Sequence, residues 1–364
     1  MTFNLVDEKR SLSDSWIREI RDAFSEQKLG IKTLFDVDDA VVDIIFVHGL
    51  NGHRDHTWSA EKSSESWPRL FLPSSLPEAR ILTYGYDAAV VSWRASISGN
   101  RIGDHSMNLL SALATYRAVD GTDHRPIIFV AHSLGGLIVK DALLTSRTSP
   151  EIHLRRILDS VRAVMFLGTP HMGASLALVA EKLAKTVGIT AKSNLKVLKM
   201  LRKDSEVLAR IQTDFCSLLR SQYGAGRLQW DITCCYEELP VAGVGVIVPK
   251  ESAVLAGYPA IGIHHDHRGM ARFASPDDPG YMSVVGELRR WVLYIQNPGS
   301  RDDRSVWRKE NSNTNRGTVV RDAGGEGDAR NSAGDGSVVI WGNVHKSVVV
   351  SGTQTIQGNL SFRH

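Results

Sequence analysis

The sequence lacks any apolar run as long as a membrane-spanning helix. Such a helix needs about 20 consecutive apolar residues, and no stretch of this chain approaches that length. The segment MTFNLVDEKRSLSDSW at the start also lacks the apolar core of a signal peptide. We therefore expect a cytoplasmic protein, and reversible contact with a membrane surface stays open.

Net charge and cysteine are also scarce. The formal net charge is only +3 over 364 residues, which does not predict a nucleic-acid-binding surface. The three cysteines are Cys216, Cys234 and Cys235, and neighbouring cysteines rarely pair with each other. This usage favours reduced, structural thiols in an intracellular protein.

Between residues 31 and 296, apolar runs alternate with helical patterns. Several runs are apolar throughout, as expected of strands buried on both faces of a parallel sheet. The pattern predicts βαβ crossovers and one domain in which helices flank a mostly parallel central sheet. The expected strands are IKTLF, VVDIIFVH, ARILTYGY, PIIFVAH, RAVMFLGT and WDITCCYE.

Three further segments set the expected boundaries. Residues 1–30 form the first segment, in which an apolar side chain recurs every four positions from Leu12 to Phe24. This predicts an amphipathic helix over residues 12–28 that packs on the main domain, with a membrane-binding or partner-binding helix as the alternative. Residues 174–222 are long and helical; they predict a cap inserted over the sheet, with an ordinary pair of packing helices as the alternative. Residues 297–316 are polar and rich in turn formers, as linkers are.

Residues 317–364 form a valine-rich tail. The segments GTVVRDAGG, GSVVIWGNV and KSVVVSGTQ each combine two valines with small residues, and between Gly336 and Phe362 only Lys346 carries a full charge. High β-propensity, low charge and the absence of proline are typical of cross-β segments. The tail is therefore expected to form β-structure, either as a prion-like assembly or as a hairpin on the edge of the sheet.

The segment IIFVAHSLGGLIVKDAL reads as a strand, a sharp turn and a helix, with Ser133 at the turn. A nucleophile elbow has the pattern G-x-S-x-G, and here Ala131 replaces the first glycine. The residues two before and two after the serine must be small, and Ala131 and Gly135 both are. Ser133 is therefore the predicted nucleophile.

A nucleophilic serine needs a base and an orienting acid. In the α/β-hydrolase fold, which a nucleophile elbow indicates, they follow in the order Ser, acid, His. The end of WDITCCYEELP supplies Glu237, with Glu238 as the alternative acid. In GIHHDHRGMARF, we choose His267 over His264 and His265 as the base.

The same histidines allow a rival reading as a metal site, because His-His-Asp-His is dense in ligands. A second ligand group would have to come from the early loop, which contains His48, His53, Asp55 and His56. We expect neither a metal nor a cofactor.

Hydrolysis of an ester also needs donors for the oxyanion. The backbone N–H of Leu134 follows the nucleophile, and that of Leu50 lies in the loop after an early strand. The remaining residues expected to line the pocket are His48, Gly49, His132, Thr169, Pro170 and His171.

Together these motifs resemble the lipase-like serine α/β-hydrolases related to GPI inositol-deacylase and the mitochondrial serine-active-site proteins. The resemblance rests on VVDIIFVHGLNGHRDHTW, WPRLFLP, ARILTYGYDA, RPIIFVAHSLGGLIVKDAL, VMFLGTPHMG and DHRGMARF, and it covers roughly residues 30–295. It implies Ser133 as nucleophile and His267 as base, and it favours Glu237 as the acid.

Within that group the sequence is most similar to the fungal branch, whose members often precede the nucleotide-binding module of NOD-like receptors. No P-loop G-x-x-x-x-G-K-[ST] follows the hydrolase segment here, and the valine-rich tail takes its place. This arrangement resembles fungal lipase-like effectors with HET-s/sigma-like prion-forming tails. It implies a role in non-self recognition and cell death, self-assembly through the tail, and a receptor that carries a matching amyloid motif.

Two hypotheses follow for the function. The first is a serine esterase or lipase that hydrolyses a carboxylic ester, of a lipid or of a soluble molecule, under control of the tail. The second is a non-catalytic adaptor that keeps the fold but works through tail assembly, because fold does not imply activity.

Overall fold

A computed structural model describes residues 29–88, 100–171, 194–221 and 230–298, together with Val179, Lys182 and Lys185. The amphipathic helix predicted within residues 1–30 lies outside the described residues, apart from its last two positions. The same holds for the valine-rich tail, for all but the first two residues of the linker, and for most of residues 172–193.

A seven-stranded sheet forms the centre of the described structure, with strand order β1-β3-β2-β4-β5-β6-β7. Strand β1 pairs antiparallel with β3, and the other neighbours are parallel. This topology is that of the α/β-hydrolase fold predicted above. The strands are β1 (Gly30–Phe35), β2 (Val42–Val47), β3 (Ala79–Gly85), β4 (Ile127–His132), β5 (Val161–Leu167), β6 (Asp231–Glu237) and β7 (Ala260–Ile263).

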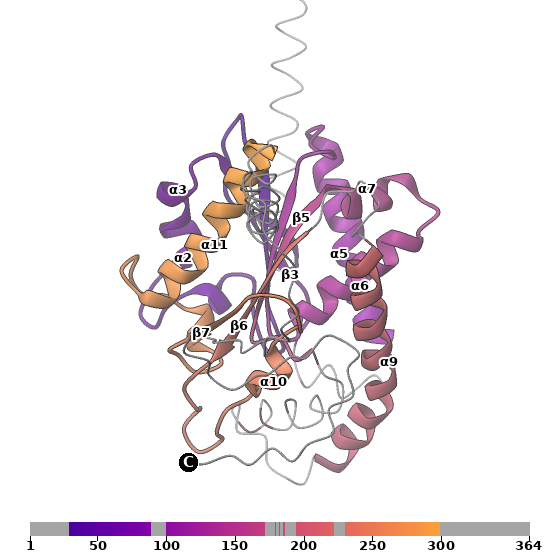
Figure 1. The fold of residues 1–364 in the computed structure, drawn as a ribbon, viewed down its shortest axis with the longest axis vertical. Helices are drawn as coiled ribbons and strands as arrows, with labels where there is room; N and C mark the ends of the chain where they lie inside the picture. Colours follow the sequence, from indigo (N-terminus) through magenta and orange to yellow (C-terminus); the bar gives the residue numbers. More distant parts are fainter. Residues whose placement is uncertain are drawn as a thin grey trace, which may run out of the picture. The chain divides into compact units, whose positions relative to one another are not determined.

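Helices cover both faces of this sheet, as Figure 1 shows. One layer contains α5 (Asn100–Val119), α6 (Gly135–Thr148), α7 (Ile152–Ser160) and α9 (Asn194–Ser221). The other contains α2 (Trp67–Leu70), α3 (Leu72–Ser75) and α11 (Pro279–Gln296). Short turns of helix occur at η1 (His56–Trp58), α10 (Lys250–Ala253) and η4 (Gly269–Ala271).

Two apolar cores follow from this layering, because successive strand residues point to opposite faces. In β2, Ile45 and Val47 pack with the α5–α6 layer, whereas Ile44 and Phe46 pack with the α11 layer. All six residues of β2 are buried. The strand is thus apolar at almost every position because it has no solvent-facing side.

Helix α9 lies within the segment predicted to be a cap, and its second half packs against α6. Ile211, Phe215 and Leu218 belong to the same buried core as α6. This half of the helix therefore completes one layer of the fold. Among the described helices, none is both long enough and apolar enough to cross a bilayer.

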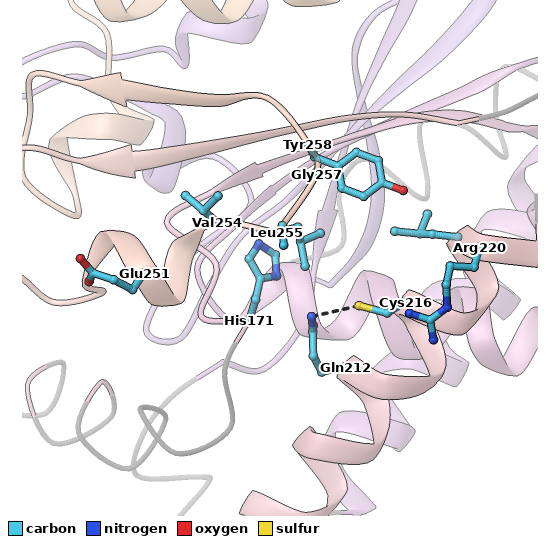
Figure 2. Close-up of a pocket in the computed structure, with 11 residues that line it drawn as sticks. His171, Gln212, Cys216, Arg220, Glu251, Val254, Leu255, Gly257 and Tyr258 are labelled. Carbon is cyan, nitrogen blue, oxygen red and sulfur yellow. Dashed lines mark hydrogen bonds between the residues drawn. The ribbon is translucent and has the colours of Figure 1, made fainter. Parts of the chain in front are cut away.

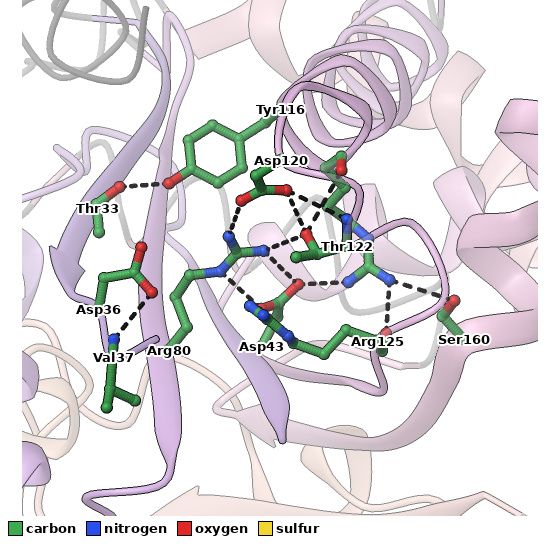
Figure 3. Close-up of polar contacts among 11 residues, drawn as sticks. Thr33, Asp36, Val37, Asp43, Arg80, Tyr116, Asp120, Thr122, Arg125 and Ser160 are labelled. Atoms are coloured by element: carbon green, nitrogen blue, oxygen red, sulfur yellow. Dashed lines mark hydrogen bonds and ion pairs between the residues drawn. The ribbon is translucent and has the colours of Figure 1, made fainter. Parts of the chain in front are cut away.

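A buried ionic network ties the amino-terminal ends of the central strands to α5, as Figure 3 shows. The Asp43 carboxylate of β2 accepts two bonds from Arg80 of β3, at 2.8 and 2.9 Å, and one of 2.5 Å from Arg117 of α5. Arg125 contributes a bond of 3.2 Å, and Asp120 also pairs with Arg80. Asp43, Arg80 and Arg117 are fully buried, so each of these charges depends on the others.

Candidate active site

Ser133 lies on the turn between β4 and α6. Its φ angle is 52°, in the left-handed region that residues other than glycine seldom adopt. Its N–H donates to the Leu167 carbonyl of β5 over 2.8 Å, which helps to hold the turn in this conformation. Such a sharp, strained connection from strand to helix is what a nucleophile elbow requires.

The chain around the elbow is packed too closely for larger residues. A Cβ atom on Gly135 would lie 2.4 Å from the His48 carbonyl oxygen, and one on Gly49 would lie 2.7 Å from the Ser133 Cβ. Ala131, by contrast, is buried in the core beside α6, where its methyl group is accommodated. The close approach thus explains why the pattern keeps glycine after the serine and tolerates alanine before it.

The structure brings Ser133, His267 and Glu237 together from three separate segments. Ser133 Oγ lies 2.9 Å from His267 Nε2, and His267 Nδ1 lies 2.5 Å from Glu237 Oε2. Glu237 ends β6, and its second oxygen accepts the N–H groups of Ile247 and Val248. The acid is therefore fixed from both sides, and all three side chains are at least 96% buried.

The neighbouring histidines each face a different carboxylate. His264 Nδ1 lies 3.3 Å from Glu238 Oε2, and His265 Nε2 lies 3.0 Å from Asp278 Oδ2. Glu238 points to the opposite side of the chain from Glu237 because successive strand residues alternate. It is 40% exposed and contacts His264 rather than His267.

Two residues beside the base hold its loop in place. His132 Nε2 lies 2.8 Å from the His267 carbonyl oxygen, and burial lowers the pKa of His132 to about 3. His132 is therefore neutral, and its Nε2–H donates to that carbonyl. Gly168 has a φ angle of 57°, and a Cβ there would lie 3.0 Å from the His267 ring. His132 thus holds the loop that carries His267.

The two predicted oxyanion donors flank the same turn. Neither Leu50 N–H nor Leu134 N–H donates to an acceptor within the described part of the chain. The Leu134 nitrogen lies 3.3 Å from the position of a Cβ on Gly49, so the loop that carries Leu50 runs along the elbow. Both groups are therefore available to an oxygen near Ser133.

His48 supports that loop. Its ring stacks on Tyr86 at 4.3 Å between centroids, and its Nδ1 lies 3.0 Å from the Gly49 carbonyl. The Tyr86 N–H donates to Nε2, so Nδ1 carries the proton and donates to Gly49. Burial lowers the pKa of His48 to about 4, which keeps the ring neutral. His48 thus shapes the backbone of the loop.

The segment Thr169-Pro170-His171 follows β5 and is buried throughout. Thr169 packs against the start of α6, where a Cβ on Gly136 would collide with its side chain. His171 contacts Lys140 of α6 rather than Ser133, with 2.5 Å between Nδ1 and Nζ. Lys140 was not among the predicted site residues. In the sequence it stands out only as a charged residue within the apolar run GGLIVKDAL.

Metal binding was the rival reading of the histidine-rich segments. Within the described ranges, no group of three His, Cys, Asp or Glu side chains is placed to hold a metal ion. His53 and His56 pack ring against ring at 4.6 Å. His264, His265 and His267, which follow β7, each contact a different carboxylate.

Comparison with known families and sequences points to serine esterases. Residues 41–202 match the family described as "Putative serine esterase (DUF676)". Protein SERAC1 of Homo sapiens is 29% identical over 268 residues, and that of Bos taurus is 33% identical over 268 residues. Both alignments cover 68% of this chain, and the chain spans 38% of the length of each relative.

Two solved structures that the chain matches at low identity are described as an esterase and a lipase-esterase related protein. Esterase B from Lactobacillus rhamnosis is 12% identical with a TM-score of 0.43, covering 82% of this chain and 97% of its own. A lipase-esterase related protein from Clostridium acetobutylicum is 12% identical with a TM-score of 0.37, covering 73% of this chain and 100% of its own. The chain has a serine-hydrolase-like α/β fold, and over residues 41–202 it is similar to serine esterases.

Proposed function

We propose that this protein hydrolyses carboxylic esters by a Ser133–His267–Glu237 triad. The observation that carries the proposal is the continuous hydrogen-bonded path from Ser133 Oγ through the His267 ring to Glu237, at 2.9 and 2.5 Å. Nucleophile, base and orienting acid stand in the order and contact that acyl transfer requires.

Each group has a defined part in the proposed reaction. His267 Nε2 takes the Ser133 proton as Oγ attacks the ester carbonyl, and Glu237 holds the Nδ1–H and stabilises the imidazolium. The N–H groups of Leu50 and Leu134 bind the oxyanion. His267 then protonates the leaving alcohol, and a water molecule activated by the same base releases the acid.

Labelling with a fluorophosphonate tests this proposal directly. The wild-type protein should react covalently at Ser133, and Ser133→Ala should not label. We expect Ser133→Ala to hydrolyse a short p-nitrophenyl ester about 10³-fold more slowly or worse, because the nucleophile is lost. Equal labelling of wild type and variant, or no labelling of a folded wild type, would refute the catalytic assignment.

We further propose that the substrate is a lipid ester and that the protein is a cytoplasmic effector controlled by its tail. The support is the low charge, repeated valines and absence of proline in residues 336–362. A NOD-like receptor with a matching motif would be its partner. A peptide of residues 311–364 should give cross-β reflections at about 4.7 and 10 Å; a peptide that stays monomeric contradicts this part alone.

The adaptor hypothesis predicts a different result from one variant. If the cellular response depends only on tail assembly, Ser133→Ala should provoke it as strongly as the wild type. If hydrolysis is the effector step, Ser133→Ala should assemble normally and give no response.

A further inference from the structure

Helix α6 carries a lysine that is fully buried without a counter-charge. Lys140 has no exposed surface, and no carboxylate contacts it among the described residues. Its Nζ lies 2.5 Å from His171 Nδ1 and 2.5 Å from Gln212 Oε1 of α9, with the rings of Phe166 and Phe215 each at 5.3 Å. Removing an ammonium group from water without an anion is costly, and burial lowers the pKa of Lys140 to about 7.

Both hydrogen-bond partners of this lysine line a cavity of about 530 Å³. The cavity lies between α9 and the loop before β7, and Figure 2 shows the residues around it. Its lining residues do not include Ser133, His267 or Glu237. Much of its wall is apolar, formed by Leu219, Val254, Leu255, Ala256 and the ring of Tyr258.

One polar donor at the wall, the side-chain amide of Gln212, has only a weak acceptor. The Gln212 side-chain oxygen accepts a hydrogen bond from Lys140. The Nε2–H of Gln212 donates only to the Cys216 sulfur, at 3.3 Å, within the described structure. His171 accepts from the ammonium at Nδ1, so its Nε2 carries a proton; that atom lies 3.6 Å from the Cys234 sulfur and the ring also bonds the Ala253 carbonyl. Thiol sulfur is a weak acceptor, so an oxygen anion would be a better partner for the Gln212 donor.

The charges around the cavity also favour an anion. Arg220 and Glu251 at the wall carry opposite charges and together add no net charge. The remaining charge is the Lys140 ammonium, which lies behind Gln212 and His171. Burial lowers the pKa of His171 and raises that of Cys234 to about 11, so both are neutral near pH 7. The Lys140 ammonium is fully buried, so its charge is screened less than that of an exposed group.

We infer that this cavity binds an amphipathic carboxylate, with its charged group at the Gln212 amide, in front of the Lys140 ammonium, and its alkyl chain along the apolar wall. The carboxylate supplies the anion that Lys140 lacks, and charge-assisted bonds replace contacts with sulfur. The inference rests on the proposed function only for the source of the ligand, since hydrolysis of a lipid ester releases such an acid.

Binding of decanoate and 1-decanol, measured by calorimetry on the full chain at pH 6.5, tests the inference. We expect decanoate to bind the wild type and Ser133→Ala equally, because binding needs no hydrolysis. Lys140→Met should weaken decanoate binding about ten-fold or more, because the attraction between the buried ammonium and the carboxylate is lost, and should leave 1-decanol binding unchanged. Arg289→Met, which removes an exposed cation outside the cavity wall, should bind decanoate as the wild type does.

Two outcomes overturn the inference. Decanoate that does not bind the wild type excludes the site, and decanoate that binds a folded Lys140→Met equally well excludes the role of the ammonium. If Lys140→Met does not fold, Cys216→Phe keeps the test, because Cys216 is half-buried and lines the cavity, so a phenyl ring there should fill the cavity and abolish binding. The two proposals can fail separately. A protein without esterase activity that binds decanoate contradicts only the proposed function, and an active esterase that does not bind decanoate contradicts only the cavity.

Discussion

At the scale of single residues, the two adjacent glutamates differ in burial and in the residues that they contact. Glu237 is buried and held by two backbone N–H groups as well as His267, whereas Glu238 is partly exposed beside His264. The alternation of side chains along a strand predicts that one of the two faces the histidine, but not which one. Glu237 was our choice at the end of this strand, the family resemblance also favours it, and in the structure its carboxylate contacts His267.

Substitution of the two glutamates tests this difference. Glu237→Gln should lower kcat by about 10³- to 10⁴-fold, because a neutral amide no longer stabilises the imidazolium or fixes its tautomer. Glu238→Gln, the matched control, should change kcat by less than about three-fold, since it alters an exposed contact. Hydrolysis of a p-nitrophenyl ester measures both, and equal losses would contradict the assignment of the acid.

At the scale of elements, the join between β4 and α6 depends on the absence of a side chain at Gly135. We expect Gly135→Ala to displace the elbow, because its Cβ would meet the His48 carbonyl oxygen at 2.4 Å. The variant should lose activity and stability together, by about 1–3 kcal/mol in unfolding free energy.

Gly103→Ala in α5 is the matched control for that substitution. A Cβ there meets nothing closer than 3.9 Å, so alanine should stabilise the helix by about 0.4–1 kcal/mol and leave activity unchanged. Urea unfolding and ester hydrolysis measured on both variants would show the contrast. A Gly135→Ala protein with normal activity would mean that the elbow relaxes at no cost.

The ionic network around Asp43 lies at the amino-terminal ends of the central strands, away from the elbow, and allows a separate prediction. Asp43→Asn leaves Arg80 and Arg117 buried without their shared anion, so it should lower the unfolding free energy by about 3–5 kcal/mol. Asp159→Asn, at an exposed position of α7, should change it by less than about 0.5 kcal/mol. Urea is the suitable denaturant because guanidinium salts would screen the charges.

At the scale of the whole molecule, Lys140 links stability to pH. Its pKa falls from 10.5 to about 7 on folding, so between these values the unfolded chain binds more protons than the folded one. The destabilisation from Lys140 is therefore complete below pH 7 and fades as the pH rises towards 10.5. Lys140→Met removes this dependence.

The free energy of unfolding in urea, compared at pH 7 and pH 9, measures that linkage. Lys140→Met should be more stable than the wild type at pH 7, and the difference should shrink at pH 9. His171, Cys216 and Cys234 surround the lysine, so the comparison of variant with wild type is needed to isolate it. A difference that is constant with pH would show that Lys140 titrates normally in the fold.

The sheet could be predicted from the sequence because six of its strands are apolar runs bounded by turns. Strand β7 was missed, since it has only four residues at the edge of the sheet and only the last of them is buried. Ser133 and His267 could be predicted because the elbow and the chain order of the triad restrict the choice. Lys140 and the Asp43 network could not, because a buried charge is recognised only by partners far away in the sequence.

The distance along the chain between Ser133 and His267 has a consequence for biosynthesis. They are 134 residues apart, and β1 to β5 all precede β6, which brings the acid. Because a chain leaves the ribosome from its amino terminus, the strained serine turn emerges well before its base. A nascent or truncated chain that ends before residue 267 should therefore carry the nucleophile in an inert form, and reactivity should arise only when the last third of the fold has docked.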